Sequence, residues 1–176
     1  MRTLAKAAGI SLGSVQQALQ DLDHRGYLAG GVTGRTRLRR RDDLITQWTA
    51  AFANRLLPSL ETRHAIGPVP TQWAQLLAGT NAGTIAGEAN RQALIRPTST
   101  TIYGRPSWAE LTKLGKLRPT RDDGNITLRE RFWDEDLLQL GTSAPALLDY
   151  AEMVASGDPR QREVADELRD RETNLT

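Results

Sequence analysis

The chain has 176 residues, of which 39% are hydrophobic and 25% are charged, and it contains no cysteine. This length is enough for one large domain or two small ones. The absence of cysteine excludes disulfide bonds, thiolate metal sites and a cysteine nucleophile. Because no apolar run approaches the length of a membrane span and no apolar signal region opens the chain, we expect a cytoplasmic protein with no membrane partner.

The net charge of +2 conceals an uneven distribution of charge along the chain. Residues 1–41 hold eight Lys or Arg against two Asp, a balance of +6 that leaves −4 for the remaining residues. A concentration of positive charge is typical of a surface that faces phosphates. The division favours a nucleic-acid-binding segment joined to a second domain with a different role.

The stretch from Arg2 to Leu28 predicts two short helices joined by a tight turn. Gly9 suits the left-handed backbone at a helix end, and Ser11 suits the N-cap of the next helix. That helix repeats apolar residues at spacings of three and four, which places on one face Leu12, Val15, Leu19 and Leu22. Such a helix-turn-helix can place its second helix in the DNA major groove.

The residues after this helix predict a basic β-hairpin. Gly26 ends the helix, Gly30 to Gly34 read as a hairpin tip, and Arg35 to Arg41 read as the returning strand. A helix-turn-helix followed by such a hairpin is a winged helix, which we assign to residues 1–41. A winged helix normally has one more helix at its start, so the chain is a fragment or a late-starting gene product, or another segment closes the core.

Residues 42–58 predict a connecting helix that packs against the hairpin or bridges two domains. Residues 59–176 predict a mixed domain, so the expected fold class is α+β. Its expected elements are a strand and turn at 61–70, a helix at 71–78, a small-sided helix at 82–94, a strand at 99–103, a helix at 107–114, a hairpin with strands at 116–119 and 126–133, a helix at 144–155, and a surface helix that Asp158 caps.

Several segments resemble a known family. TLAKAAGISLGSV and QDLDHRGYL are similar to bacterial winged-helix regulators in general. Four later segments are more specific: LITQWTAAFANRLLPSL, GTIAGEANRQALIRPTSTTIYG, GKLRPTRDDGNITLRERFW and APALLDYAEMVASGDPRQREVADEL. Together they resemble the AbiEi-type antitoxins of type IV abortive-infection toxin–antitoxin systems, in the branch with a winged helix before the antitoxin domain.

The resemblance implies a DNA-binding antitoxin that represses its own operon. Its functional partner would be a nucleotidyltransferase-like toxin, which such antitoxins oppose without forming a tight complex. Members of that branch usually have sequence before the winged helix, whereas this chain starts inside it. Autonomous binding to the operator therefore does not follow from the resemblance.

Candidate DNA-contacting residues divide into two sets. Base reading is expected at the start and on the exposed face of the second helix, from Ser11, Leu12, Gly13, Ser14, Gln16, Gln17 and Gln20, since glutamine can pair bidentately with adenine. Phosphate contacts are expected from Arg25, Arg35, Arg37, Arg39, Arg40 and Arg41, and strand alternation would place Arg35, Arg37, Arg39 and Arg41 on one face. The alternative is that both sets are ordinary solvent-exposed side chains with no role in DNA binding.

We expect no enzyme, metal site or cofactor. His24 and His64 are too few for a metal site with ordinary ligand spacing. Residues 141–144 faintly resemble the start of a nucleotidyltransferase motif, but the carboxylates that follow, Asp149 and Glu152, fall on a predicted helix instead of at strand ends.

The leading hypothesis is a DNA-binding transcriptional autoregulator and antitoxin, expected to form a homodimer because operators have two half-sites. One alternative is a protein–protein interaction module derived from a truncated winged-helix protein that no longer binds DNA. Another is a degenerate enzyme related to nucleotidyltransferases.

Overall fold

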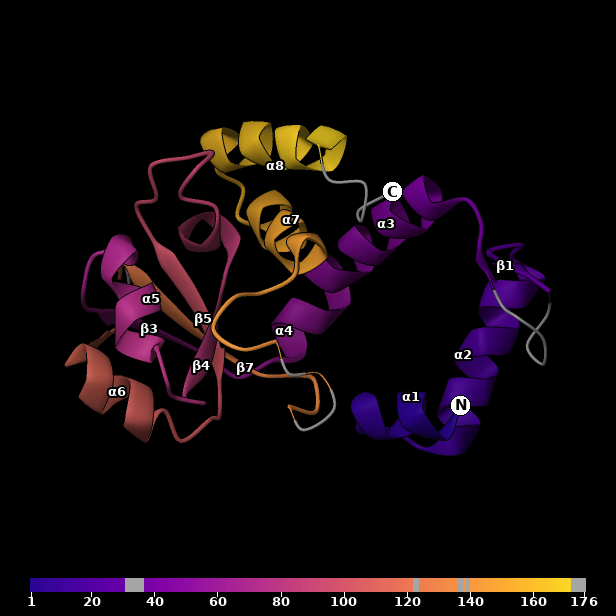
Figure 1. The fold of residues 1–176 in the computed structure, drawn as a ribbon, viewed down its shortest axis with the longest axis horizontal. Helices are drawn as coiled ribbons and strands as arrows, with labels where there is room; N and C mark the ends of the chain where they lie inside the picture. Colours follow the sequence, from indigo (N-terminus) through magenta and orange to yellow (C-terminus); the bar gives the residue numbers. More distant parts are fainter. Residues whose placement is uncertain (31–36, 122–123, 136–137, 139, 172–176) are drawn as a thin grey trace.

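The computed structural model describes residues 1–30, 37–121, 124–135, 138 and 140–171. The fold is mixed α+β, as predicted, and consists of a small N-terminal lobe (residues 1–40), a helical rod (residues 41–59) and a larger body (residues 60–171) (Figure 1). The lobe contains α1 (Arg2–Ala7), α2 (Leu12–His24) and the antiparallel strands β1 (Leu28–Ala29) and β2 (Arg37–Leu38). The rod contains α3 (Arg41–Ala51), the π-helical turn η1 (Phe52–Leu56) and α4 (Leu57–Ser59).

The body is built around a five-stranded mixed sheet with the strand order β4-β5-β7-β3-β6. β5 and β7 are parallel, whereas the other neighbours are antiparallel. Its elements in chain order are β3 (Thr62–Ile66), η2 (Pro70–Gln72), α5 (Trp73–Leu77), β4 (Gly83–Ala86), η3 (Gly87–Asn90), β5 (Thr100–Gly104), α6 (Ala109–Gly115), β6 (Arg118–Thr120), β7 (Ile126–Glu130), α7 (Ala146–Ala155) and α8 (Pro159–Arg171).

Both edges of the sheet are closed to further pairing. Along β4, the N–H of Ile85 donates to the carbonyl oxygen of Thr142 and its carbonyl oxygen accepts from Ala144, both at 2.8 Å. The other edge strand, β6, has three residues, and the central one, Pro119, has no N–H to donate. A short strand with a central proline is a poor template for another strand.

Side-chain alternation along the strands gives the sheet two different faces. Ile102 and Leu128, paired in register, lie in one core with Trp73 of α5 and Leu111 of α6. Tyr103 lies in the opposite core with residues of η1 and α7. α8 then covers α7 from outside, so the layers run from α5 and α6 through the sheet to α7 and α8 (Figure 1).

The structure confirms several of the predicted elements. The strand at 99–103 is β5, the helix at 71–78 is η2 with α5, and the helix at 107–114 is α6. Asp158 caps α8, since its Oδ1 accepts from the N–H of Arg160 at 2.8 Å. The predicted apolar stripe of α8 is its buried side, with Val164, Ala165 and Leu168 all buried.

The predicted helix at 82–94 is wrong, because this stretch forms β4 and the 3₁₀ turn η3. Its small residues do allow a close approach, but of a strand. Gly83 pairs with Gly104, and a Cβ at Gly83 would lie 2.6 Å from Cγ2 of Ile102. The small side chains therefore serve a tight strand pair beneath α6.

The predicted hairpin of 116–119 with 126–133 is also wrong. Both segments form strands, β6 and β7, but β3 lies between them and pairs with each: Ala65 faces Pro119 on one side and Ile126 on the other. β6 and β7 are therefore not paired with each other, as a hairpin would require.

The rod connects the lobe to the body through apolar contacts. Ile45 of α3 lies in the core cluster of Met153 and Val164. Nη2 of Arg169 on α8 donates to the carbonyl oxygen of Asp42 at 3.3 Å. An apolar groove of about 540 Å³ separates the lobe from the rod, and its lining includes Leu22, Leu38, Leu44, Trp48 and Leu147.

A fully buried carboxylate fixes α7 to the loop after β4. Oδ1 of Asp149 accepts from the N–H of Gly87 at 2.8 Å, and Oδ2 accepts from Nδ2 of Asn90 and Nε of Arg91, each at 2.7 Å. Burial raises the pKa of Asp149 to about 7, against the lowering effect of Arg91 and the N–H donors. The native state therefore holds this proton more tightly than the unfolded chain.

This raised pKa predicts a pH dependence of stability. Because the native pKa of Asp149 is about 7 and its ordinary value is 3.8, the free energy of unfolding should fall as pH rises between these values. Asp149→Asn should be less stable throughout, with a shallower slope by up to about 1.4 kcal/mol per pH unit. Urea unfolding between pH 4 and 7.5 measures this. Asp166→Asn, on the exposed side of α8, is the control, and equal slopes in all three proteins would contradict the prediction.

Candidate nucleic-acid interface

Local sequence builds α1 and α2 as a helix-turn-helix. Gly9 has φ of +62°, the left-handed conformation that lets the chain leave α1. Ser11 then takes an extended backbone and its Oγ accepts from the N–H of Ser14 at 3.0 Å, which caps α2. Within α2 only Val15 is buried, and Figure 1 shows the helix standing clear of the body. Most of its other side chains are exposed, whereas Leu19, Leu22 and Asp23 are half-buried.

The polar side chains of α2 do not all share one face. Ser14, Gln17 and Gln20 line a shallow hollow of about 620 Å³ along the helix. Gln16 is exposed but does not line this hollow; it lies about 100° around the helix from Gln17 and about 40° from Gln20. Of the candidate base-reading set, Ser11, Leu12 and Gly13 are exposed at the start of the helix.

Two residues missed by the sequence reasoning complete this face. Asp21 and His24 also line the hollow. They lie four and seven residues after Gln17, the spacing that keeps side chains on one side of a helix, and that spacing could have identified them. The hollow therefore offers amide, hydroxyl, carboxylate and imidazole groups along a helix about 20 Å long.

Part of the predicted arginine strand is present beside the end of α2. β1 and β2 pair with Leu28 opposite Leu38, and the N–H of Arg39 donates to the carbonyl oxygen of Tyr27 at 2.8 Å. Arg37 and Arg39 are exposed on either side of Leu38. Arg35 and most of the predicted hairpin tip lie outside the described residues.

The prediction that Arg41 shares a strand face with Arg37 and Arg39 is wrong. β2 ends at Leu38, Arg40 has φ of +50°, and Arg41 is the first residue of α3. The change of direction at residue 40 takes Arg41 to the edge of the apolar groove.

The remaining arginines at the end of α2 are held by other side chains. Arg40 pairs with Asp43 at 2.8 Å, and its guanidinium carbon lies 5.3 Å from the ring centre of Tyr27. Nε of Arg25 lies 3.1 Å from Oδ1 of Asp21, one helical turn earlier. Among the described residues, no ion pair engages Arg37 or Arg39. These two cations are therefore the most available for phosphates.

The sequence analysis compared Asp149 and Glu152 with the carboxylates of a nucleotidyltransferase motif. Both lie buried on α7. Glu152 pairs with Arg129 at 3.0 Å, and burial raises its pKa. Within the described part of the chain, no three His, Asp or Glu side chains are grouped to hold a metal ion. No described helix has the length and apolar character needed to cross a membrane.

Comparison with known proteins gives one family. Residues 37–174 match the family described as "Transcriptional regulator, AbiEi antitoxin, Type IV TA system". The matched region covers the rod and the body and begins at β2, so α1 and α2 precede it. No curated protein and no solved structure was found to match the chain.

The cap of α2 provides a test of the local geometry. Ser11→Ala removes the acceptor for the N–H of Ser14 and should destabilise the start of α2 by about 1 kcal/mol. Amide hydrogen exchange in the first turn of α2 should then be about fivefold faster. Ser107→Ala, the same change at an exposed serine outside the lobe, is the matched control. Exchange in the first turn of α2 that is no faster in Ser11→Ala than in this control would contradict the assignment.

Proposed function

Because the chain belongs to the AbiEi antitoxin family of type IV toxin–antitoxin systems, whose members are transcriptional regulators, we propose that its N-terminal lobe binds double-stranded DNA and that the protein represses its own operon. The observation that carries this proposal is the exposed polar face of α2 beside Arg37 and Arg39. A groove-sized helix with uncompensated cations at its end is suited to reading bases while holding phosphates.

The chemistry of the α2 face supports direct reading of bases. The amides of Gln17 and Gln20 can each pair bidentately with adenine, and the carboxylate of Asp21 can accept from the amino group of cytosine. The ion pair of Asp21 with Arg25 fixes both side chains near the end of the helix. Arg37 and Arg39 then bind phosphates, which contributes affinity without sequence preference.

We assign the antitoxin activity to the body, and we infer a nucleotidyltransferase-like toxin as the functional partner, opposed without a tight complex. The family match to residues 37–174 supports this assignment. We also propose that the protein binds its operator as a homodimer, because a two-fold operator needs two copies of α2 about one DNA turn apart.

A second candidate function is a protein–protein interaction module. The observation that favours it is the apolar groove between lobe and rod, together with exposed apolar residues outside the candidate DNA-contacting set: Leu4, Ile10 and Leu38. A gel shift with the upstream region of the gene decides between the two functions. Retention of the duplex supports DNA binding, and no retention of any duplex at low salt leaves the interaction module.

The orientation of α2 predicts unequal roles for two adjacent glutamines. Gln17→Ala should weaken binding to the operator by about 1–3 kcal/mol and relax the sequence preference at one position, because alanine cannot pair with a base. Gln16→Ala, the same change at a side chain that does not line the hollow, should leave the affinity within about a factor of two. Fluorescence anisotropy with operator and scrambled duplexes measures both, and a larger effect at Gln16 would refute this orientation.

The exposed arginines predict an effect on salt dependence. Replacing Arg37 and Arg39 with Ala should weaken operator and scrambled DNA about equally. The slope of log K against log salt should fall by about 0.9 for each phosphate that is no longer neutralised. Arg162→Ala, at an exposed site on α8, should leave the slope unchanged. An unaltered slope in the double variant would show that these cations do not bind DNA.

A further inference from the structure

A polar cavity of about 280 Å³ lies in the body, far along the chain from α2. It is formed where η3, α7 and α8 meet the polar face of β5 and β7. Its volume is just below the range of about 300–1,000 Å³ that is usual for sites of drug-sized ligands. The cavity therefore suits a smaller molecule.

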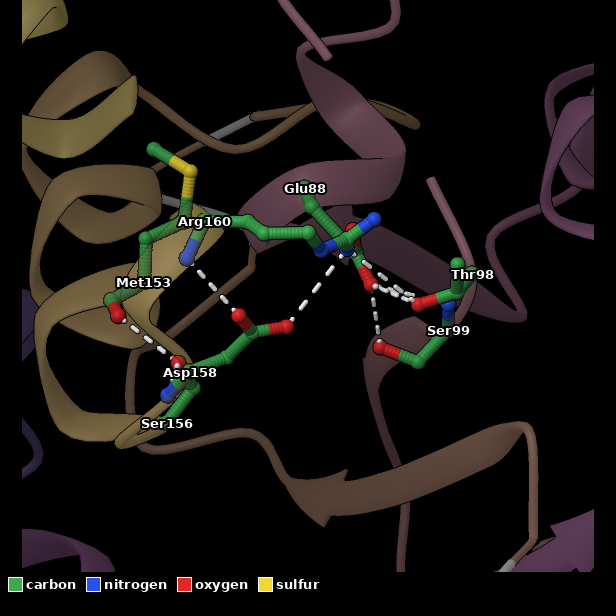
Figure 2. Close-up of polar contacts among 7 residues, drawn as sticks. All are labelled: Glu88, Thr98, Ser99, Met153, Ser156, Asp158 and Arg160. Carbon is green, nitrogen blue, oxygen red and sulfur yellow. Dashed lines mark hydrogen bonds and ion pairs between the residues drawn. The ribbon is translucent and has the colours of Figure 1, made fainter. Parts of the chain in front are cut away.

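One wall of the cavity consists of groups that satisfy one another, as Figure 2 shows. Oε1 of Glu88 accepts from the N–H of Ser99 at 2.9 Å and from its hydroxyl at 2.7 Å, while Oε2 lies 3.2 Å from Nη2 of Arg160. Asp158 accepts from the N–H of Arg160, and Oγ of Ser156 accepts from the N–H of Asp158. These groups shape the wall but have little bonding capacity left for a ligand.

Three other residues that line the cavity, Thr101, Arg129 and Glu152, have polar groups with unused bonding capacity. Glu152 is 5% exposed, and both Tyr103 and Arg129 approach only its Oε1, so Oε2 takes no hydrogen bond from a described residue. Arg129 places Nε 3.0 Å from Glu152 and Nη1 3.4 Å from Oγ1 of Thr62, which leaves other N–H groups of its guanidinium available. The hydroxyl of Thr101 has no hydrogen-bond partner among the described residues.

Gln161 on α8 is the most informative group. Its side chain lines the cavity and is only 9% exposed, yet its amide makes no hydrogen bond with any described residue. Its neighbours on the buried side of α8, Val164 and Leu168, belong to the apolar core. Its amide atoms are not among the fully enclosed, unpartnered atoms of the described residues, so they open into the cavity and can bond to a molecule held there.

We infer that this cavity binds a free α-amino acid, a role beyond the DNA binding proposed above. The unused groups include a carboxylate oxygen and a guanidinium on side chains only 3.0 Å apart, which matches an ammonium and a carboxylate joined by one carbon. The ammonium would donate to Glu152 and Thr101, the carboxylate would accept from Arg129, and the amide of Gln161 would complete either group. Because Glu152 and Arg129 already neutralise each other, a zwitterion adds no net charge to this site, whereas a ligand with one charge would.

The test is a titration of the ¹⁵N-labelled full chain with each of the twenty common amino acids at millimolar concentration. At least one should produce saturable shifts in the backbone amide signals of Thr101, Glu152 and Gln161. For that amino acid, the analogue without the ammonium and the analogue without the carboxylate should each bind at least about tenfold more weakly. No shift with any amino acid, or equal binding of either analogue, overturns the inference.

Two variants identify the site. Gln161→Leu should lower the affinity at least about tenfold while the midpoint of thermal unfolding stays the same or rises, because leucine suits the apolar neighbours. Gln75→Leu, the same change on the exposed side of α5, is the matched control and should bind as wild type does. If Gln161→Leu does not fold, Thr101→Val, which removes a hydroxyl at similar volume, must show the weaker binding. Unchanged affinity in the folded cavity variant overturns the inference.

Discussion

The burial of α7 on both of its sides constrains the arrangement of the body. Leu148 and Ala151 face the core beneath the sheet, and Met153 faces α8. The same helix brings in two carboxylates, Asp149 and Glu152, each of which lies against an arginine from another part of the chain. Breaking a buried ion pair costs about 3–5 kcal/mol, so the position of α7 fixes both the loop after β4 and the polar face of β7. The cavity is a consequence, since helix and sheet are separated there by polar side chains.

The lobe depends on the rod more than on a core of its own. Tyr27, Leu28 and Val15 are buried in it, but the three large core clusters of the described chain include no lobe residue. Direct contact with the body includes a hydrogen bond from the N–H of Asp134 to the carbonyl oxygen of Ala7 at 3.1 Å. This arrangement leaves the polar face of α2 uncovered, while α3 links the lobe to the body.

The sequence predicted an element correctly where its conformation depends on residues within the same turn or strand. Ser11 and Asp158 cap helices because their side chains bond to amides two or three residues later. The β-branched run at 99–103 forms a strand for an equally local reason. Pairing in the sheet depends on distant residues, and nothing near residues 116–133 indicates that β3 lies between two strands close to each other in the chain. The small residues at 82–94 signalled a close approach without specifying whether a helix or a strand approaches.

The same distinction applies to the candidate site. A helical projection places Asp21 and His24 on the same side of α2 as Gln17, so this part of the face could have been predicted from the sequence. The left-handed turn at Arg40 was not, because it depends on the start of α3 and on the ring of Tyr27. The groups of the cavity come from segments about seventy residues apart along the chain, and only folding brings them together.

The closed edges of the sheet limit how two copies of this chain can associate. Residues 142–144 already occupy the backbone of β4, and Pro119 interrupts the donors of β6. The edges of the five-stranded sheet are therefore poor sites for adding a strand from a second copy. Exposed apolar side chains offer another kind of contact, and most of the large ones among the described residues lie in the lobe. Oligomerisation of this protein would thus be expected to alter the spacing of its α2 helices directly, without a change in the body.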